Sequence, residues 1–263
     1  MEKIVLACDI DNTLIYSRKH PHDGWPCVER IHGEEQAYMS PGTCELLETV
    51  SKQVRFIPVT SRSVEQYSRI SWPGQWIPEC AVTTHGAKLF IRGEEDGQWQ
   101  TETEELVAPW RDELRRMETL LAPDPSYIRC RTVDDAYLFV YCASGTDPEA
   151  VGRKFREMTD LTICIGGKKI YLLPPQMNKG NAVERLRQRF PKHTVIAAGD
   201  SEMDLDMLNA ADYALFPEGI AGRVNVPGNC CPKETLLSEF VLKTLQTRCD
   251  AVKSDSDDET DLP

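Results

Sequence analysis

Two short acidic segments carry the residues best suited to chemistry. Asp9 and Asp11 end an apolar run that begins at Ile4, and Asp200 and Asp204 follow a second strand-like run. In an open α/β sheet, ligands bind beyond the carboxyl ends of the strands, so these acids can border one pocket. Asp9, Asp11 and Asp200 would repel one another without a cation. Mg²⁺ suits them because it is a hard ion that prefers oxygen ligands and often accompanies a substrate phosphate.

Two further segments offer what a phosphate group needs. Thr60, Ser61 and Arg62 end another strand-like run and open a helix, where hydroxyls and free backbone N–H groups make an anion site. Asn178 is a plausible N-cap of a later helix. It precedes Lys179, which can place a cation beside the carboxylates. Each segment alone is a common capping or surface feature, but together they lie at the strand ends and helix starts of one α/β unit.

Strand-like and helix-like stretches alternate near both ends of the chain. The expected strands cover residues 4–11, 54–60, 80–84, 194–198 and 213–216. The expected helices cover residues 44–52, 63–70, 178–190, 202–211 and 233–245. This alternation predicts an α/β fold with a doubly wound, Rossmann-like parallel sheet that is covered on both faces.

The middle of the chain follows a different order. Strands are expected at 88–91, 99–101, 127–133, 137–142, 161–165 and 170–173, and helices at 109–121 and 148–158. A helix–strand–strand pattern thus occurs twice, which predicts an inserted α+β cap domain. We therefore divide the chain into a discontinuous core (1–84 and 175–250), a cap (85–174) and an acidic tail (251–263). The tail has little apolar content and is expected to be disordered.

Four short motifs, taken in order, resemble those of a known family. DIDNTL (9–14), VTSR (59–62), NKG (178–180) and GDSEMD (199–204) look like the four motifs of the haloacid dehalogenase (HAD) superfamily of phosphatases. The inserted region lies between the second and third motifs, where the C2-type cap of Cof-like and sucrose-phosphatase-like members sits. The HGA run at 85–87 resembles the segment that leads into the cap in Cof-like members. The resemblance extends from residue 4 to about residue 245.

The resemblance implies roles for the residues that touch substrate. Asp9 matches the nucleophile that becomes an aspartyl-phosphate. Asp11 matches the general acid that protonates the leaving oxygen and then activates water. Thr60 matches the residue that hydrogen-bonds the transferring phosphoryl group, and we expect Ser61 and Arg62 beside it to bind substrate.

The remaining implied roles are electrostatic. Lys179 matches the cation that steadies the nucleophile and the phosphate. Asp200 matches a Mg²⁺ ligand, together with a side-chain oxygen of Asp9 and the backbone carbonyl of Asp11, and Asp204 matches a supporting acid. Two positions depart from the family pattern. They are Met203, where Asn is usual, and Asn12, where Gly is common.

The motifs favour one function over two alternatives. The favoured function is a Mg²⁺-dependent phosphomonoesterase that acts on a small phosphorylated metabolite, such as a sugar phosphate. A phosphomutase of the phosphomannomutase type shares the fold, the cap class and both aspartates. A catalytically silent binding module on the same fold is the third possibility, and the intact motif residues argue against it.

Composition excludes some partners and suggests a compartment. The chain has 263 residues with 30 Lys and Arg against 42 Asp and Glu, a net charge of −12. Nucleic acid and anionic membranes are therefore poor partners. No apolar run approaches the ~20 residues of a membrane span. The first apolar run is too short for a signal peptide, and the ten cysteines are expected to be reduced thiols, so we predict a cytoplasmic protein.

Substrate choice rests on cations near the cap and on one unusual segment. The candidates for contact with the leaving group are Arg62, His85, Arg129, Arg131, Lys168 and Lys169. Residues 16–39 show little periodicity and form either a flap over the site or a long surface loop. This segment also holds His20, His22, Cys27 and His32. Their spacing matches no zinc pattern, which favours a polar loop over a metal site.

Overall fold

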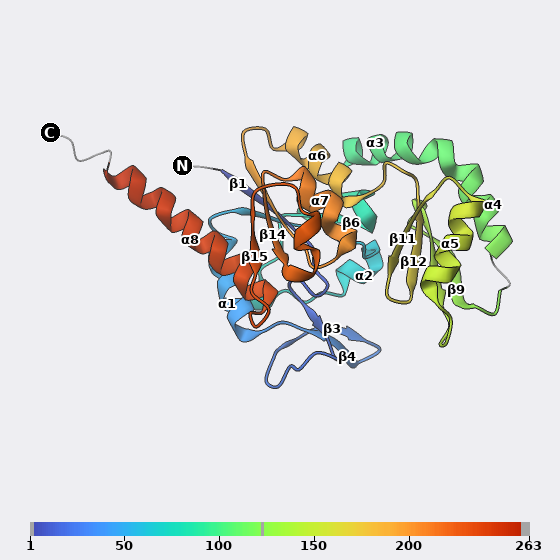
Figure 1. Ribbon diagram of the computed structural model, residues 1–263. Helices are drawn as coiled ribbons and strands as arrows, with labels where there is room; N and C mark the ends of the chain where they lie inside the picture. The colour runs from blue at the N-terminus through green and yellow to red at the C-terminus, as the bar shows by residue number, and fades with distance from the viewer. Residues whose placement is uncertain (1–2, 122–123, 259–263) are drawn as a thin grey trace.

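The structure is a computed structural model that describes residues 3–121 and 124–258, and its centre is a five-stranded parallel sheet (Figure 1). The strand order is β15-β14-β13-β1-β5. The strands are β1 (Ile4–Cys8), β5 (Arg55–Pro58), β13 (Thr194–Ala198), β14 (Tyr213–Pro217) and β15 (Gly228–Cys231). Every neighbouring pair is parallel, so the predicted doubly wound α/β fold is confirmed.

Helices cover both faces of this sheet. In β1, Leu6 and Cys8 pack with α1 (Pro41–Val50) and α8 (Leu237–Asp258) in one apolar cluster. Val5 and Ala7 pack on the opposite face with α6 (Lys179–Arg189) and α7 (Leu205–Ala210). Because alternate residues of a strand point to opposite faces, a strand buried on both sides must be apolar throughout, as β1 is.

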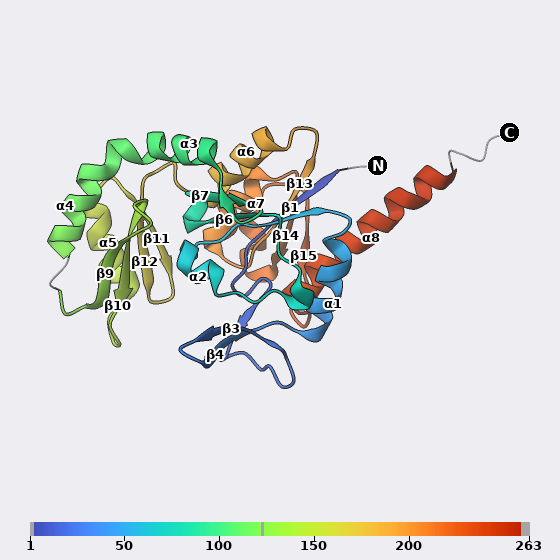
Figure 2. The same cartoon turned by 180° about the vertical axis from the view of Figure 1, so that it is seen from behind.

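A second sheet forms the centre of the cap. It is antiparallel, in the order β11-β12-β10-β9. Its strands are β9 (Tyr127–Val133), β10 (Tyr137–Cys142), β11 (Thr162–Gly166) and β12 (Lys169–Leu173). Helices α4 (Arg111–Leu121) and α5 (Pro148–Met158) bury their apolar sides against it in a separate apolar cluster. Figures 1 and 2 show the cap at the end of the molecule opposite α8.

The segment that leads into the cap differs from the prediction. Strand β6 (Cys80–Thr83) pairs with β7 (Lys88–Ile91), which pairs with β8 (Glu94–Glu95). The strand expected at 99–101 is instead part of helix α3 (Gly97–Val107), because Asp96 caps the helix by accepting a hydrogen bond from the backbone N–H of Trp99. Leu89 and Trp99 pack in a core cluster. We therefore propose that the division between core and cap follows Trp99 rather than residue 85.

Residues 16–39 form a small antiparallel sheet. Strands β2 (Tyr16–Ser17), β4 (Glu34–Tyr38) and β3 (Cys27–Ile31) pair in that order, with the turn at His32 and Gly33 in the left-handed region. We call residues 16–39 the flap sheet. Among the described residues, the one group of side chains that could hold a metal is Asp9, Asp200 and Asp204, so the histidines of this segment form no such cluster.

Helix α8 continues past its expected end at residue 245. Residues 251–258, which were expected to belong to a disordered tail, extend the helix, and residues 259–263 lie outside the described part of the chain. No Gly or Pro occurs between residues 237 and 258, so nothing in the local sequence ends the helix earlier. Within the described residues, none of the helices combines the length and the apolar composition that a membrane span requires.

Short helices complete the fold. Helix α2 spans Val64–Ser68 and begins at Ser63, which forms a capping box with Gln66. Short 3₁₀ helices occur at Pro73–Gln75, Thr84–Gly86, Ala108–Trp110, Glu202–Asp204 and Glu218–Arg223.

Candidate active site

The predicted site residues gather at the carboxyl edge of the central sheet. Asp9 follows β1, and its backbone N–H donates to the carbonyl of Ala198 at 2.9 Å, which sets it beside the end of β13. Asp200 follows β13. Thr60 follows β5 and donates its backbone N–H to the carbonyl of Val82. Three neighbouring strands thus deliver three polar residues to one edge, as the strand-end rule predicts.

Lys179 joins two carboxylates in the buried centre of the site. Its Nζ donates to Asp9 Oδ1 at 2.5 Å and to Asp204 Oδ1 at 2.6 Å, and all three side chains are buried. Lys179 is the first residue of α6, whose N-cap Asn178 accepts from the backbone N–H of Asn181. Burial acts to lower the pKa of Lys179, but the two carboxylates outweigh it and hold the ammonium charged.

Burial and mutual repulsion disfavour the ionised forms of two carboxylates in this centre. Burial raises the pKa of Asp9 well above its usual range; Lys179 opposes this rise, and Asp204 adds to it. Burial and the nearby Asp204 likewise raise the pKa of Asp200 to about 7. Two raised carboxyl pKa values beside a single ammonium indicate a site that an additional cation would stabilise.

The donor set fits Mg²⁺. Carboxylate oxygens of Asp9, Asp200 and Asp204 lie within 4.8 Å of one another. Asp204 already uses Oδ1 for Lys179, and its Oδ2 accepts from the backbone N–H groups of Asp200 and Ser201. Asp9 and Asp200 are therefore the carboxylates best placed to hold the ion. Asp204 instead accepts hydrogen bonds from the backbone of the turn that follows β13.

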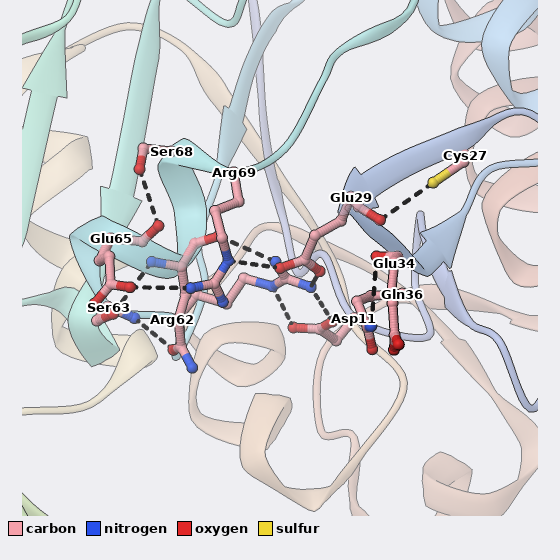
Figure 3. A network of polar contacts seen from close by, with 11 residues as sticks. Asp11, Cys27, Glu29, Glu34, Gln36, Arg62, Ser63, Glu65, Ser68 and Arg69 are labelled. Atoms are coloured by element: carbon pink, nitrogen blue, oxygen red, sulfur yellow. Dashed lines mark hydrogen bonds and ion pairs between the residues drawn. The ribbon is translucent and has the colours of Figure 1, made fainter. Parts of the chain in front are cut away.

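Asp11 lies apart from this centre, in an ion-pair network (Figure 3). Arg62 binds it with two hydrogen bonds, from Nε at 2.9 Å and from Nη2 at 2.8 Å. Nη2 also donates to Glu29 Oε2 at 2.9 Å, and Arg69 Nε donates to Glu29 Oε1 at 3.1 Å. Burial acts to raise the pKa of Asp11, but Arg62 outweighs it and lowers the pKa. In this arrangement Asp11 is an ionised carboxylate, which can accept a proton.

Sequence reasoning missed Glu29 and Arg69. Glu29 is buried although it belongs to a segment without a clear periodicity, and it reaches Arg62 only because β3 folds back toward α2. The sequence offers no local signal for this pairing, since Glu29 and Arg62 are 33 residues apart.

A cleft of about 400 Å³ opens beside Asp11 and lies between the core, the cap and the flap sheet. Ser61 and Arg62 line it from the core, and Glu29 lines it from the flap sheet. Thr60 is buried beneath them, and its hydroxyl accepts from the backbone N–H of Arg62 at 3.1 Å. The cleft is therefore lined by the carboxylate of Asp11 rather than by Asp9, Asp200 or Asp204, and it is open to a small ligand.

The structure separates the candidates for leaving-group contact. Arg129, Arg131 and Lys169 line the cleft from the cap, as does Arg62 from the core. Lys168 is exposed and does not line the cleft. His85 is buried against Tyr137 and Tyr171, and burial lowers its pKa to about 3, so its imidazole is neutral.

The cap meets the core at the turn between β9 and β10. Asp134 Oδ2 accepts from the backbone N–H of Val64 at 3.1 Å and from the hydroxyl of Thr84 at 2.6 Å. The hydroxyl of Tyr137 donates to the carbonyl of Ser61 at 3.3 Å. This end of the cap sheet is thus hydrogen-bonded to the core at Ser61, Val64 and Thr84.

Both departures from the family pattern have a structural explanation. Asn12 has a φ of 59°, the left-handed conformation that Gly adopts without strain and that Asn tolerates best among other residues. Met203 packs against the apolar cluster of the cap, close to Gly166 at the end of β11, where an added Cβ would lie 2.9 Å from its sulfur. Met203 therefore makes an apolar contact with the cap.

Comparisons with known proteins agree with this fold. A family model described as haloacid dehalogenase-like hydrolase matches residues 130–216. The solved structure of sucrose-phosphatase from Synechocystis, in complex with sucrose and phosphate, is similar with a TM-score of 0.63 and 14% identity, over 95% of this chain and 99% of that chain. A search of curated proteins finds no match for the chain.

Two further solved structures are similar. One is a trehalose-6-phosphate phosphatase related protein, with a TM-score of 0.56 and 19% identity, over 96% of this chain and 100% of that chain. The other is trehalose-6-phosphate phosphatase from Aspergillus fumigatus, with a TM-score of 0.54 and 17% identity, over 95% of this chain and 93% of that chain. The predicted resemblance to the HAD-like hydrolases is thereby confirmed for residues 130–216, and the solved structures share the fold of this chain.

Proposed function

We propose that the protein is a Mg²⁺-dependent phosphomonoesterase that acts on a small phosphorylated metabolite through an aspartyl-phosphate on Asp9. The observation that carries the proposal is the buried ammonium of Lys179, which lies 2.5 Å from Asp9 and 2.6 Å from Asp204 at the carboxyl edge of the sheet. A sugar phosphate is the favoured substrate class, because similar structures are described as phosphatases of sucrose phosphate or trehalose 6-phosphate type.

The first half of the reaction transfers the phosphoryl group to Asp9. A carboxylate oxygen of Asp9 attacks phosphorus, the bond between phosphorus and the leaving oxygen breaks, and Asp11 gives that oxygen a proton. Lys179 fixes the orientation of Asp9 and offsets the negative charge of the transferring group. Mg²⁺, when bound by Asp9 and Asp200, supplies further positive charge for the phosphate oxygens.

The second half regenerates the enzyme. Asp11, now ionised, takes a proton from water, and the water oxygen attacks the phosphorus of the aspartyl-phosphate. The bond between Asp9 and phosphorus breaks, and inorganic phosphate leaves. The contact with Arg62 favours the ionised form of Asp11 that this step needs. Its role as an acid in the first half requires that contact to loosen when substrate is bound.

Two isosteric variants test the nucleophile and the acid. Asp9→Asn should abolish turnover of every phosphate ester, since an amide cannot form the aspartyl-phosphate. Asp11→Asn should still be phosphorylated by p-nitrophenyl phosphate, whose leaving group needs no proton, but should not release the phosphate. Stopped-flow absorbance should show a burst of about one equivalent of p-nitrophenol followed by a stall. Asp206→Asn, an exposed change in the same region, should behave like the wild type. Wild-type turnover by Asp9→Asn would contradict the proposal and favour a binding module.

Metal dependence gives an independent test. Mg²⁺ should raise the melting temperature, because it binds the folded carboxylate cluster and not the unfolded chain. It should also restore activity after treatment with EDTA. Ca²⁺ should raise the melting temperature but support little turnover, because its larger and looser coordination displaces the in-line geometry. Full activity in excess EDTA, measured as phosphate release, would refute the mechanism.

A further inference from the structure

One face of the cap sheet presents a patterned surface to the cleft. Side chains of alternate residues point to the same face of a strand, and the strand register aligns them across three strands. Two rows result: Arg129, Tyr141 and Lys169 in one, and Arg131, Phe139 and Tyr171 in the next. All six line the cleft, whereas the opposite face of the sheet is covered by α4 and α5. We call this surface the cap row face.

The cations of the cap row face have no partner of their own. Arg129, Arg131 and Lys169 form no hydrogen bond or ion pair through their side chains with any residue in the described part of the chain. Arg62 and Arg69, in the same cleft, are instead neutralised by Asp11 and Glu29. Five cations and two carboxylates line the cleft, although the chain as a whole carries a net charge of −12. A local excess of positive charge attracts an anionic ligand.

The transferring phosphate does not account for these cations. In the proposed reaction, Lys179 serves that group from the core, where its ammonium binds the nucleophile Asp9. Arg129 and Arg131 belong to the cap, on the side where the remainder of a substrate would lie. The excess charge therefore faces the leaving group.

The aromatic residues of the rows define the shape of that group. Phe139 and Tyr141 are half-buried, so each shows part of its ring to the cleft. A flat aromatic face packs well against the apolar face of a sugar or another ring. The cleft of about 400 Å³ is in the range of sites for small molecules.

We propose, on the basis of the proposed phosphatase function, that the leaving group is a ring that carries a second anionic group, either a carboxylate or a further phosphate. Arg129, Arg131 and Lys169 bind that anion, and the rings of Phe139 and Tyr141 support the body of the leaving group. A site built to pair with a charged group rejects the analogue that lacks it, because its own polar groups are then left without partners.

A matched set of substrates tests this specificity. Glucose 1-phosphate, glucuronic acid 1-phosphate and glucose 1,6-bisphosphate share a ring and differ at C6, where they carry a hydroxyl, a carboxylate and a phosphate. The wild-type kcat/KM should be about tenfold or more higher for at least one of the two charged substrates than for glucose 1-phosphate. Which of the two is preferred identifies the anion. An equal or higher value for glucose 1-phosphate overturns the inference and leaves the phosphatase function standing.

Variants locate the effect on the cap row face. In Arg129→Gln/Arg131→Gln, and independently in Lys169→Gln, the preference for the charged substrate should fall toward unity. The matched control is Arg153→Gln, an exposed change on α5 at the opposite side of the cap sheet, which should keep the wild-type preference. Melting curves establish that each variant is folded. Retention of the full preference in both test variants would contradict the assignment.

Binding separates this inference from the proposed function. Isothermal titration of Asp9→Asn in Mg²⁺ buffer measures affinity without turnover. It should give a dissociation constant for the preferred charged substrate about tenfold or more below that for glucose 1-phosphate. If the wild type hydrolyses no ester, the phosphatase function fails, and this titration still decides the inference. Equal dissociation constants overturn it.

Discussion

The contrast between Lys179 and Arg62 shows how two buried cations serve different purposes. Lys179 bridges Asp9 and Asp204, so its charge is held where a phosphoryl group would be transferred. Arg62 instead joins Asp11 to Glu29, and so connects the first motif to the flap sheet. Removing one partner from a buried ion pair leaves the other charge uncompensated, which costs more than the pair itself contributes. Neutralising either cation is therefore expected to lower the free energy of unfolding.

Glu29→Gln tests the ion pairs that Glu29 forms with Arg62 and Arg69. The change keeps the shape of the side chain but removes the charge that offsets Arg62 and Arg69, so we expect the free energy of unfolding to fall by about 1–3 kcal/mol. Glu65→Gln is the matched control, because Glu65 also binds Arg69 but its side chain is 78% exposed. It should change stability by less than about 0.5 kcal/mol. Urea denaturation measures the free energy of unfolding of both variants. Equal losses would show that the buried ion pairs contribute no more to stability than the exposed pair does.

The sequence alone predicts the position of those site residues that lie close to the end of a strand. Asp9, Thr60 and Asp200 each lie within two residues of the end of a strand, so the strand prediction alone brings them to one edge. It was insufficient for Glu29, whose burial depends on the way β3 and β4 pair and fold over the core. The motif resemblance implied which acids would bind the metal and which would support them, but spacing alone offers no physical reason for that division. That division depends on which oxygens of Asp204 are already occupied.

At the scale of elements, close approach between helices constrains one motif. Gly180 lies in the first turn of α6, and a Cβ there would lie 2.6 Å from the carbonyl oxygen of Asp206 at α7. The glycine of the third motif therefore allows α6 to pack directly on α7 and so fixes the position of Lys179. Local propensity would favour Ala in a helix, so it is packing that requires Gly here.

Gly180→Ala should destabilise the protein by about 1–3 kcal/mol, because the clash with backbone outweighs the gain in helix propensity. Gly222→Ala is the control. Its Cβ would meet nothing within 4 Å and its φ is not positive, so we expect little change. Urea denaturation gives the difference in stability, and an unchanged stability in Gly180→Ala would mean that α7 moves aside without cost.

Elements with an internal periodicity were predicted better than those that depend on pairing. Helices α4 and α5 bury regularly spaced apolar residues, so their expected positions hold within two residues. Residues 99–101 belong to helix α3 rather than to the expected strand. The buried residues Trp99, Thr103 and Val107 lie on one side of this helix, but their spacing indicates a helix only once Asp96 is recognised as its N-cap. For residues 16–39 the sequence leaves a flap and a surface loop as alternatives, because β3 and β4 are short and contain several charged residues.

At the scale of the whole molecule, two sheets have separate apolar cores. Leu138 lies in the cluster beneath the cap sheet, and Ile57 lies in a cluster against the central sheet. Two cores that share few residues are expected to open as separate cooperative units. This supports the proposed division of the chain into a discontinuous core and an inserted cap.

Hydrogen exchange tests that division. Leu138→Ala should cost about 2–5 kcal/mol and should reduce protection in β9, β10, β11 and β12, while protection in β1 and β13 changes little. Ile57→Ala, a change of similar size in the core, should lower protection in the central sheet first. Mass spectrometry of exchanged peptides distinguishes the two patterns. A uniform loss of protection in Leu138→Ala would show that the molecule unfolds as one unit.

The contact at Asp134 gives the cap a mechanical property. The turn that holds Asp134 is hydrogen-bonded to Val64 and Thr84, so one end of the cap sheet is fixed to the core at this point. Arg129 lies four residues along β9 from Val133, a distance of about 13 Å at the usual rise per residue. If the cap sheet rotated by roughly 10° about this fixed point, Arg129 would move by about 2 Å and Tyr137 would stay almost in place. A rotation of the cap about this contact would therefore displace Arg129 and the neighbouring Tyr141 much more than Tyr137, which lies beside the contact.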